Sequence, residues 1–151
     1  MTRHICDPLT PLSWRTQSGV ILKRVQQLIA RNNITMFSTK RPAGYRALDN
    51  TINDFLASFT GSHHLEFGPD VTMDRLLAYN NTLLATILLH ENFVSLSDRT
   101  SYSNVRTEQA TKAVLQTIYE LLASSFDFNL LHPYIYMSWT VSRFLLVHQT
   151  A

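Results

Sequence analysis

The most constraining feature of this sequence is a run of apolar residues that recur at helical intervals between positions 66 and 93. The run follows a turn signature at 68–70, and either Asp70 or Thr72 can cap the helix that starts there. Intervals of three, four and seven residues place the apolar side chains on one face of a helix. These side chains belong to Met73, Leu76, Leu77, Leu83, Leu84, Ile87 and Leu88. A helix of about 20 residues is roughly 30 Å long, so we expect a central rod around which the other segments pack.

Three further segments show the same helical spacing of apolar residues, at about 19–30, 46–59 and 105–123. The first connection is marked by Pro42 and Gly44, and the third connection is a polar stretch. Four amphipathic helices predict an all-α fold, an antiparallel four-helix bundle with up-down-up-down topology.

The length of 151 residues and the hydrophobic content of 45% are typical of one domain with a buried core. We expect the bundle to span residues 19–124. An irregular N-terminal arm at 1–18 and an aromatic C-terminal segment at 125–151 flank it in this prediction. A very short β piece is expected near 65–67.

Charge is nearly balanced, with 13 Lys and Arg residues against 11 Asp and Glu residues, so binding of a polyanion depends on where the cations lie. In an up-down-up-down bundle the first and third connections lie at the same end, here called the cationic pole. With the adjoining helix ends they carry one acid, Asp98, and six cations: Arg31, Lys40, Arg41, Arg46, Arg99 and Arg106. Arginines suit phosphate groups, and Tyr45 or Tyr102 can stack on bases. The alternative is that these are ordinary solvated loop charges.

Other function classes find little support in the sequence. Cys6 has no basic partner and cannot form an internal disulfide, and the serines and threonines lie in no nucleophile or phosphate-binding motif. The histidines at 63, 64 and 90 lack the three-ligand spacing of a zinc site. We therefore expect no catalytic residues, no metal and no cofactor. Without a signal-peptide pattern or a long apolar run, we expect a soluble, intracellular chain with no membrane partner.

Several short stretches carry a further signal because they keep a definite order along most of the chain. They are FSTKR at 37–41, LEFGPD at 65–70, YNNTLLATILL at 79–89, RTEQATKAV at 106–114, and YELL at 119–122 followed by an aromatic tail that ends at Trp139. In this order and spacing they resemble the coat proteins of rod-shaped plant viruses of the tobacco mosaic virus type.

The resemblance implies a bundle that stacks side by side into a helical rod and holds genomic single-stranded RNA at the cationic pole. By position, Arg106 is an RNA contact at the head of the fourth helix, and Glu108 and Gln109 stand where the family has acids near the RNA. Lys40, Arg41 and Arg99 match family contacts only within a few positions. Arg46 is included because it lies at the cationic pole. The predicted RNA-binding set is Lys40, Arg41, Arg46, Arg99, Arg106, Glu108 and Gln109.

The chain departs from the family where the family places a carboxylate in its third helix, because Leu84 stands near that position. Two acids from neighbouring subunits cannot both stay ionised cheaply, and such pairs let rods respond to pH and divalent ions. Asp54, Glu108 and Glu120 are the remaining candidates for subunit-interface carboxylates. The apolar tail after Trp139 also differs from the family's polar C-terminus, which suggests an extra subunit contact or a relative outside the plant viruses.

Together these features predict a non-enzymatic structural protein, a viral coat protein that forms a helical homo-polymer and packages single-stranded RNA without sequence readout. Its expected location is the virion, with assembly in the host cytoplasm. We expect Arg106→Ala to abolish RNA-containing rods and to leave the fold intact. The alternative is a helical interaction module, or adaptor, that grips a protein partner with its aromatic C-terminal segment.

Overall fold

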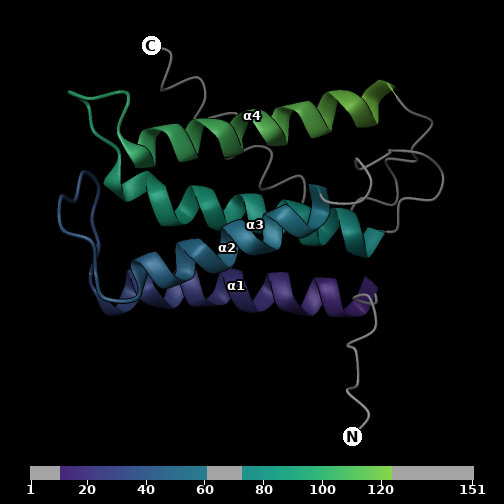
Figure 1. Ribbon diagram of the computed structural model, residues 1–151, viewed down its shortest axis with the longest axis horizontal. Helices are drawn as coiled ribbons and strands as arrows, with labels where there is room; N and C mark the ends of the chain where they lie inside the picture. Colours follow the sequence, from purple (N-terminus) through teal and green to yellow (C-terminus); the bar gives the residue numbers. More distant parts are fainter. Residues whose placement is uncertain (1–10, 61–72, 124–151) are drawn as a thin grey trace, which may run out of the picture.

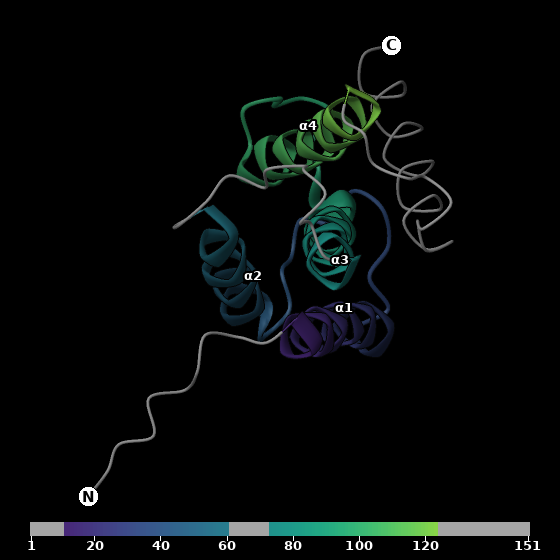
Figure 2. The same ribbon diagram turned by 90° about the vertical axis from the view of Figure 1, so that its right-hand side faces the viewer.

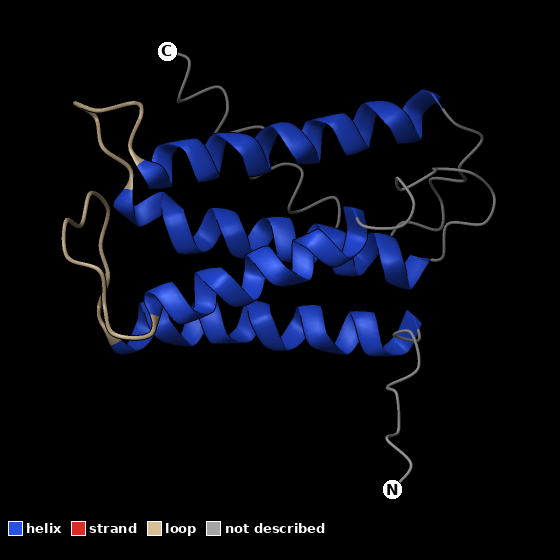
Figure 3. Ribbon diagram, viewed as in Figure 1, coloured by secondary structure: helices blue, strands red, loops and turns tan. Residues whose placement is uncertain are grey.

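The computed structural model describes residues 11–60 and 73–123, which contain four long helices (Figures 1 and 3). These are α1 (Pro11–Arg31), α2 (Tyr45–Thr60), α3 (Met73–His90) and α4 (Tyr102–Ala123), and a short 3₁₀ helix, η1 (Glu91–Phe93), continues α3. The described residues contain no strand. Successive helices run in opposite directions, so the prediction of an antiparallel all-α bundle is confirmed. The expected β piece at 65–67 and aromatic segment at 125–151 lie outside the described residues.

Helix α3 lies at the centre of the bundle, with α1 and α4 on opposite sides of it and α2 alongside (Figure 2). Most of its predicted apolar face is buried, but so are residues on its other sides, such as Ala78 and Ala85. Thr82 and Thr86 fit this dry environment because their hydroxyls donate to backbone carbonyls one turn earlier, at 2.7 and 2.9 Å. Helix α3 is therefore buried on more than the one apolar face that the sequence predicts.

Helix α1 begins at Pro11, so the irregular arm expected over 1–18 is wrong from that residue onward. Proline is compatible with the first turn of a helix, because its missing N–H would have no helical partner there. The additional turns are held by Trp14, whose ring packs on Phe55 and Phe59 of α2 at centroid distances of 5.7 and 4.3 Å.

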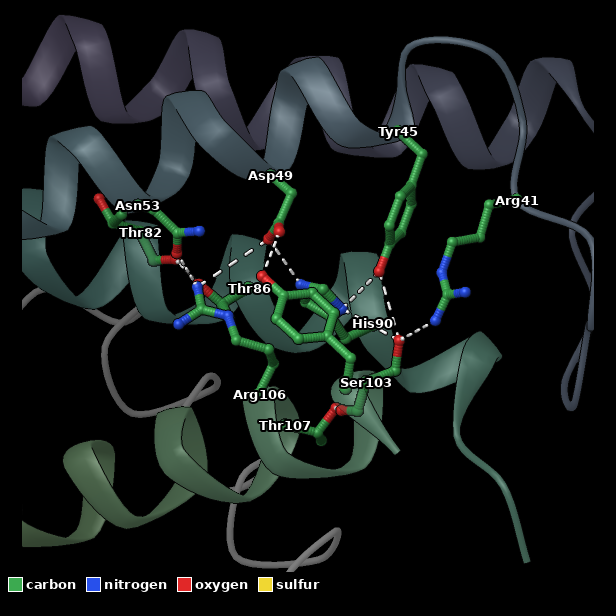
Figure 4. A network of polar contacts seen from close by, with 11 residues as sticks. Arg41, Tyr45, Asp49, Asn53, Thr82, Thr86, His90, Ser103, Arg106 and Thr107 are labelled. Atoms are coloured by element: carbon green, nitrogen blue, oxygen red, sulfur yellow. Dashed lines mark hydrogen bonds and ion pairs between the residues drawn. The ribbon is translucent and has the colours of Figure 1, made fainter. Parts of the chain in front are cut away.

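Helix α4 also begins earlier than expected, at Tyr102 instead of 105. The reason is a serine cap: the Ser101 hydroxyl accepts a hydrogen bond from the backbone N–H of Asn104 at 3.4 Å. This extra turn matters for the site, because it places Ser103 on the helix beside α2 and α3 (Figure 4) and lets the Tyr102 hydroxyl donate to Asp49 of α2.

The core consists of two apolar clusters on either side of α3. One joins α1, α2 and α3 and includes Val25, Ile52 and Phe59; the other joins α3 and α4 and includes Ile87 and Val114. Near the cationic pole, α2 and α4 instead meet through polar side chains. Among the described helices, none is both long enough and apolar enough to cross a membrane.

Candidate nucleic-acid interface

The structure brings the first and third connections of the bundle to the same end (Figures 1 and 3). The first loop is tied to η1, which leads into the third connection, because the backbone N–H of Ser38 donates to the carbonyl of Asn92 at 2.8 Å. The cationic pole defined from the sequence is therefore one continuous end of the molecule. The first loop is held in place by contacts to η1 and α4, which lie far away in the chain.

The six cations of the pole divide into an outward and an inward group. Four are exposed and make no hydrogen bond or ion pair with the described residues; they are Arg31, Lys40, Arg46 and Arg99. Asp98 forms no ion pair with them among the described residues; its carboxylate instead accepts hydrogen bonds from the Thr100 hydroxyl and backbone N–H at 2.6 and 2.9 Å. These bonds lower the pKa of Asp98. The outward group is thus available to an external polyanion.

Arg41 is also exposed, but it belongs to the inward group because its guanidinium contacts other parts of the protein. One of its N–H groups donates to the Ser103 hydroxyl on α4 at 3.2 Å. Its guanidinium carbon also lies 5.2 Å from the centre of the Tyr45 ring and 5.7 Å from that of Phe93. Arg41 therefore anchors the first loop to α4 and η1.

Arg106 lies between α2 and α4, with its side chain 16% exposed. Its guanidinium donates to the Asn53 side-chain oxygen and lies 4.0 Å from a carboxylate oxygen of Asp49. Its place at the head of the fourth helix predicts an RNA contact, and in the structure its guanidinium contacts Asn53 and lies near Asp49 within the protein. The expectation that Arg106→Ala leaves the fold intact stays a prediction, to which this placement adds a cost in stability.

Behind the pole lies a buried polar network centred on His90 (Figure 4). The ring is fully buried, with Nε2 2.8 Å from Asp49 Oδ1, and Nδ1 2.7 Å from the Tyr45 hydroxyl and 3.2 Å from the Ser103 hydroxyl. Because a carboxylate only accepts, we assign the proton to Nε2, which leaves Nδ1 to accept from Tyr45. Each ring nitrogen then has a partner, and α2, α3 and α4 are joined at one point.

Asp49 is the anion that holds this network together. Burial by itself would raise its pKa, but hydrogen bonds from His90 and Tyr102, together with the charge of Arg106, outweigh burial and lower the pKa below its ordinary value. For Tyr102 the shift is opposite: burial and its hydrogen bond to the carboxylate raise the pKa of the phenol. Asp49 is therefore ionised, and Tyr102 protonated, at neutral pH.

The chain Ser103–His90–Asp49 has the order of a nucleophile, base and carboxylate, yet its geometry does not suit catalysis. Ser103 and His90 are both 0% exposed, so no substrate can reach the hydroxyl. The Ser103 hydroxyl is also occupied, since it accepts a hydrogen bond from Arg41. We interpret these three residues as a structural link between helices.

The predicted acidic residues lie on the surface and apart from this network. Glu108 pairs with Lys112 one turn along α4, at 2.5 Å, and Gln109 beside it is exposed. Asp54 is exposed on α2, and Glu120 near the end of α4 accepts a hydrogen bond from the Gln116 amide at 2.9 Å. Within the described ranges, no group of His, Cys, Asp and Glu side chains could hold a metal ion.

Removing the Arg106 guanidinium is expected to destabilise the protein. Arg106→Ala should lower the free energy of unfolding by about 1–3 kcal/mol, because the amide of Asn53 and the carboxylate of Asp49 lose a charged partner. Urea denaturation followed by circular dichroism measures this loss. The matched control is Arg46→Ala, which removes an exposed arginine without a partner and should change stability by no more than about 0.5 kcal/mol. Equal stability of the two variants would contradict the assigned role of Arg106.

Comparison with protein-family models, with curated proteins and with solved structures finds no match for this chain. The resemblance to rod-shaped virus coat proteins therefore stays a prediction from short ordered stretches. What can be argued about function rests on the placement of the side chains described above.

Proposed function

We propose that this protein is a structural coat protein that binds single-stranded RNA through its cationic pole and assembles with many copies of itself into a helical rod. The observation that carries the proposal is the outward group of cations at one end of the bundle: Arg31 and Arg46 at helix ends, and Lys40 and Arg99 in the first and third connections. All four are exposed and make no hydrogen bond or ion pair with the described residues. An RNA backbone is the polyanion that the resemblance suggests for this surface.

Unpaired cations make this surface suitable for phosphates, because they have no internal partner to give up on binding. Each phosphate that a cation neutralises releases condensed counterions, so the affinity depends on salt. The inward cations support the same function indirectly. Arg41 fixes the first loop and Arg106 fixes the start of α4, so less conformational freedom is lost when RNA binds.

Assembly would multiply a modest affinity per subunit. Four cations give each copy only a few phosphate contacts, but neighbouring copies on one RNA strand bind with a high effective concentration. The carboxylates of Asp54, Glu108 and Glu120 are exposed and can contact a neighbouring copy, with Glu108 leaving its pair with Lys112 to do so. In such contacts, apposed acids would weaken the rod as they ionise.

Binding of a fluorescent oligouridylate, measured by anisotropy over a range of salt concentrations, tests the interface. Arg46→Gln/Arg99→Gln should reduce the slope of log affinity against log salt by about 1.4, since each phosphate contact on a single strand contributes about 0.7. The matched control is Lys23→Gln/Arg24→Gln, which removes the same charge from exposed positions in the middle of α1. If both doubles lower the slope equally, binding follows net charge and the interface is wrong.

Negative-stain electron microscopy of the purified protein with RNA tests the assembly. We expect rods or discs, and a protein that remains a dispersed monomer at high concentration would contradict the coat-protein proposal. The same result would favour the adaptor alternative, whose aromatic segment at 125–151 lies outside the described residues.

A further inference from the structure

A pocket of about 540 Å³ opens at the cationic pole, between the start of α2 and the start of α4. Its walls are formed by Arg41, Pro42, Tyr45, Arg46, Asp49, Asn50 and Tyr102. We propose that this pocket holds one nucleotide of the bound strand, with the base stacked on the Tyr102 ring and the phosphate on Arg46. This inference rests on the proposed function and names the site at which an RNA base would be held.

Tyr102 is suited to be the stacking surface. Its hydroxyl donates to Asp49 Oδ2 at 2.5 Å, and its ring lies edge-on to that of His90, with centroids 5.5 Å apart and planes at 77°. The residue nevertheless remains 49% exposed. The ring is thus held in one orientation by buried groups while part of its surface is open. Tyr45, the other tyrosine at the pole, is only 5% exposed and cannot serve in this way.

Cationic groups lie on the same walls. Arg46 has no hydrogen bond or ion pair with the described residues, so its whole guanidinium fork is available for a phosphate. Arg41 presents the N–H groups that it does not use on Ser103. The carboxylate of Asp49 repels a phosphate from the part of the pocket near Tyr102. The charges therefore orient a nucleotide with its phosphate toward the arginines and its base toward the ring.

The remaining wall offers hydrogen bonds without a fixed choice of base. Asn50 is exposed, makes no hydrogen bond with the described residues, and carries both a donor and an acceptor on its amide. The volume falls within the range of small-ligand sites, about 300–1,000 Å³. A site of this kind binds any base by stacking, which agrees with packaging that does not depend on sequence.

Titration of the protein with adenosine 5′-monophosphate, followed by ¹H–¹⁵N NMR, tests the proposal. We expect the amide signals of residues 41–50 and 102–103 to shift. Tyr102→Leu should weaken binding about tenfold, within the range measured for loss of one base–aromatic stack. Tyr102→Phe keeps the ring and should retain binding within about threefold. Tyr119→Leu is the matched control, because it removes an exposed tyrosine near the other end of α4.

The outcomes separate this inference from the proposed function. Inorganic phosphate that binds as tightly as the nucleotide, or a Tyr102→Leu variant that folds and binds normally, would overturn the nucleotide site. If the nucleotide shifts no amide signals of the pocket while the oligouridylate still binds through Arg46 and Arg99, the inference fails and the proposed function stands. If the nucleotide binds but the oligouridylate does not, the pocket stands and the coat-protein proposal fails.

Discussion

Replacing Asp49 with alanine is expected to lower the free energy of unfolding by about 3–5 kcal/mol, the usual result of removing one member of a buried charged pair. The carboxylate accepts hydrogen bonds from His90 and Tyr102 and lies near the guanidinium of Arg106, while its side chain is only 7% exposed. Without it, the fully buried N–H of His90 loses its acceptor, and the Tyr102 hydroxyl and the Arg106 guanidinium lose a charged partner. Urea denaturation at pH 7 should show the loss as a lower midpoint with an unchanged slope.

Asp54→Ala provides the control, because Asp54 lies on the same helix but is exposed and makes no hydrogen bond or ion pair with the described residues. That substitution should change stability by no more than about 0.5 kcal/mol. A loss of the same size in both variants would mean that helix propensity or net charge, and not the network, determines the effect.

The pH dependence of the same variant checks the charge state of the network. The pKa of Asp49 is lowered in the folded protein, so its contribution to stability is fully present above the ordinary value of 3.8 and is lost as the pH falls through the folded-state value. The stability difference between wild type and Asp49→Ala should therefore be constant near neutrality and shrink below about pH 4. A difference that grows on acidification would show that the folded carboxyl is protonated.

The architecture could be predicted because it depends on the intervals between apolar residues and on the lengths of the connections between helices. The helical periodicity found the positions of all four helices, and their alternation brought the two basic loops to one end. The start of α1 could not be predicted from Pro11, since a proline that breaks a helix and a proline that begins one look alike in sequence. Packing of Trp14 against α2 decides between them.

The buried network could not be predicted, because Asp49, His90 and Ser103 come from three helices and form no local motif. One signal was present: His90 follows a run of leucines on the central helix. A histidine in such a position is expected to be buried, and its ring nitrogens then need hydrogen-bond partners. The inward turn of Arg106 follows from the same network. Sequence position alone cannot distinguish an arginine that contacts RNA from one that contacts Asn53.

Replacing Phe59 with alanine is expected to lower the free energy of unfolding by about 3–5 kcal/mol, the usual cost of emptying a buried aromatic site. Phe59 is 2% exposed, and its ring contacts those of Trp14, Phe55 and Tyr79 at centroid distances of 4.3, 5.2 and 5.4 Å. These rings come from α1, α2 and α3. The cavity would therefore lie where three helices meet, and their backbones cannot all close on it.

Phe37→Ala is the matched control, because that phenylalanine is nearly half exposed in the first loop, and its positive φ of 61° disfavours phenylalanine and alanine alike. It should cost less than about 1 kcal/mol, since little apolar surface leaves a buried site. Thermal and urea denaturation of both variants, under conditions where wild type unfolds reversibly, give the comparison. A Phe59→Ala variant as stable as Phe37→Ala would mean that α1 does not pack on α2 through Trp14, and the extended start of α1 would then be wrong as well.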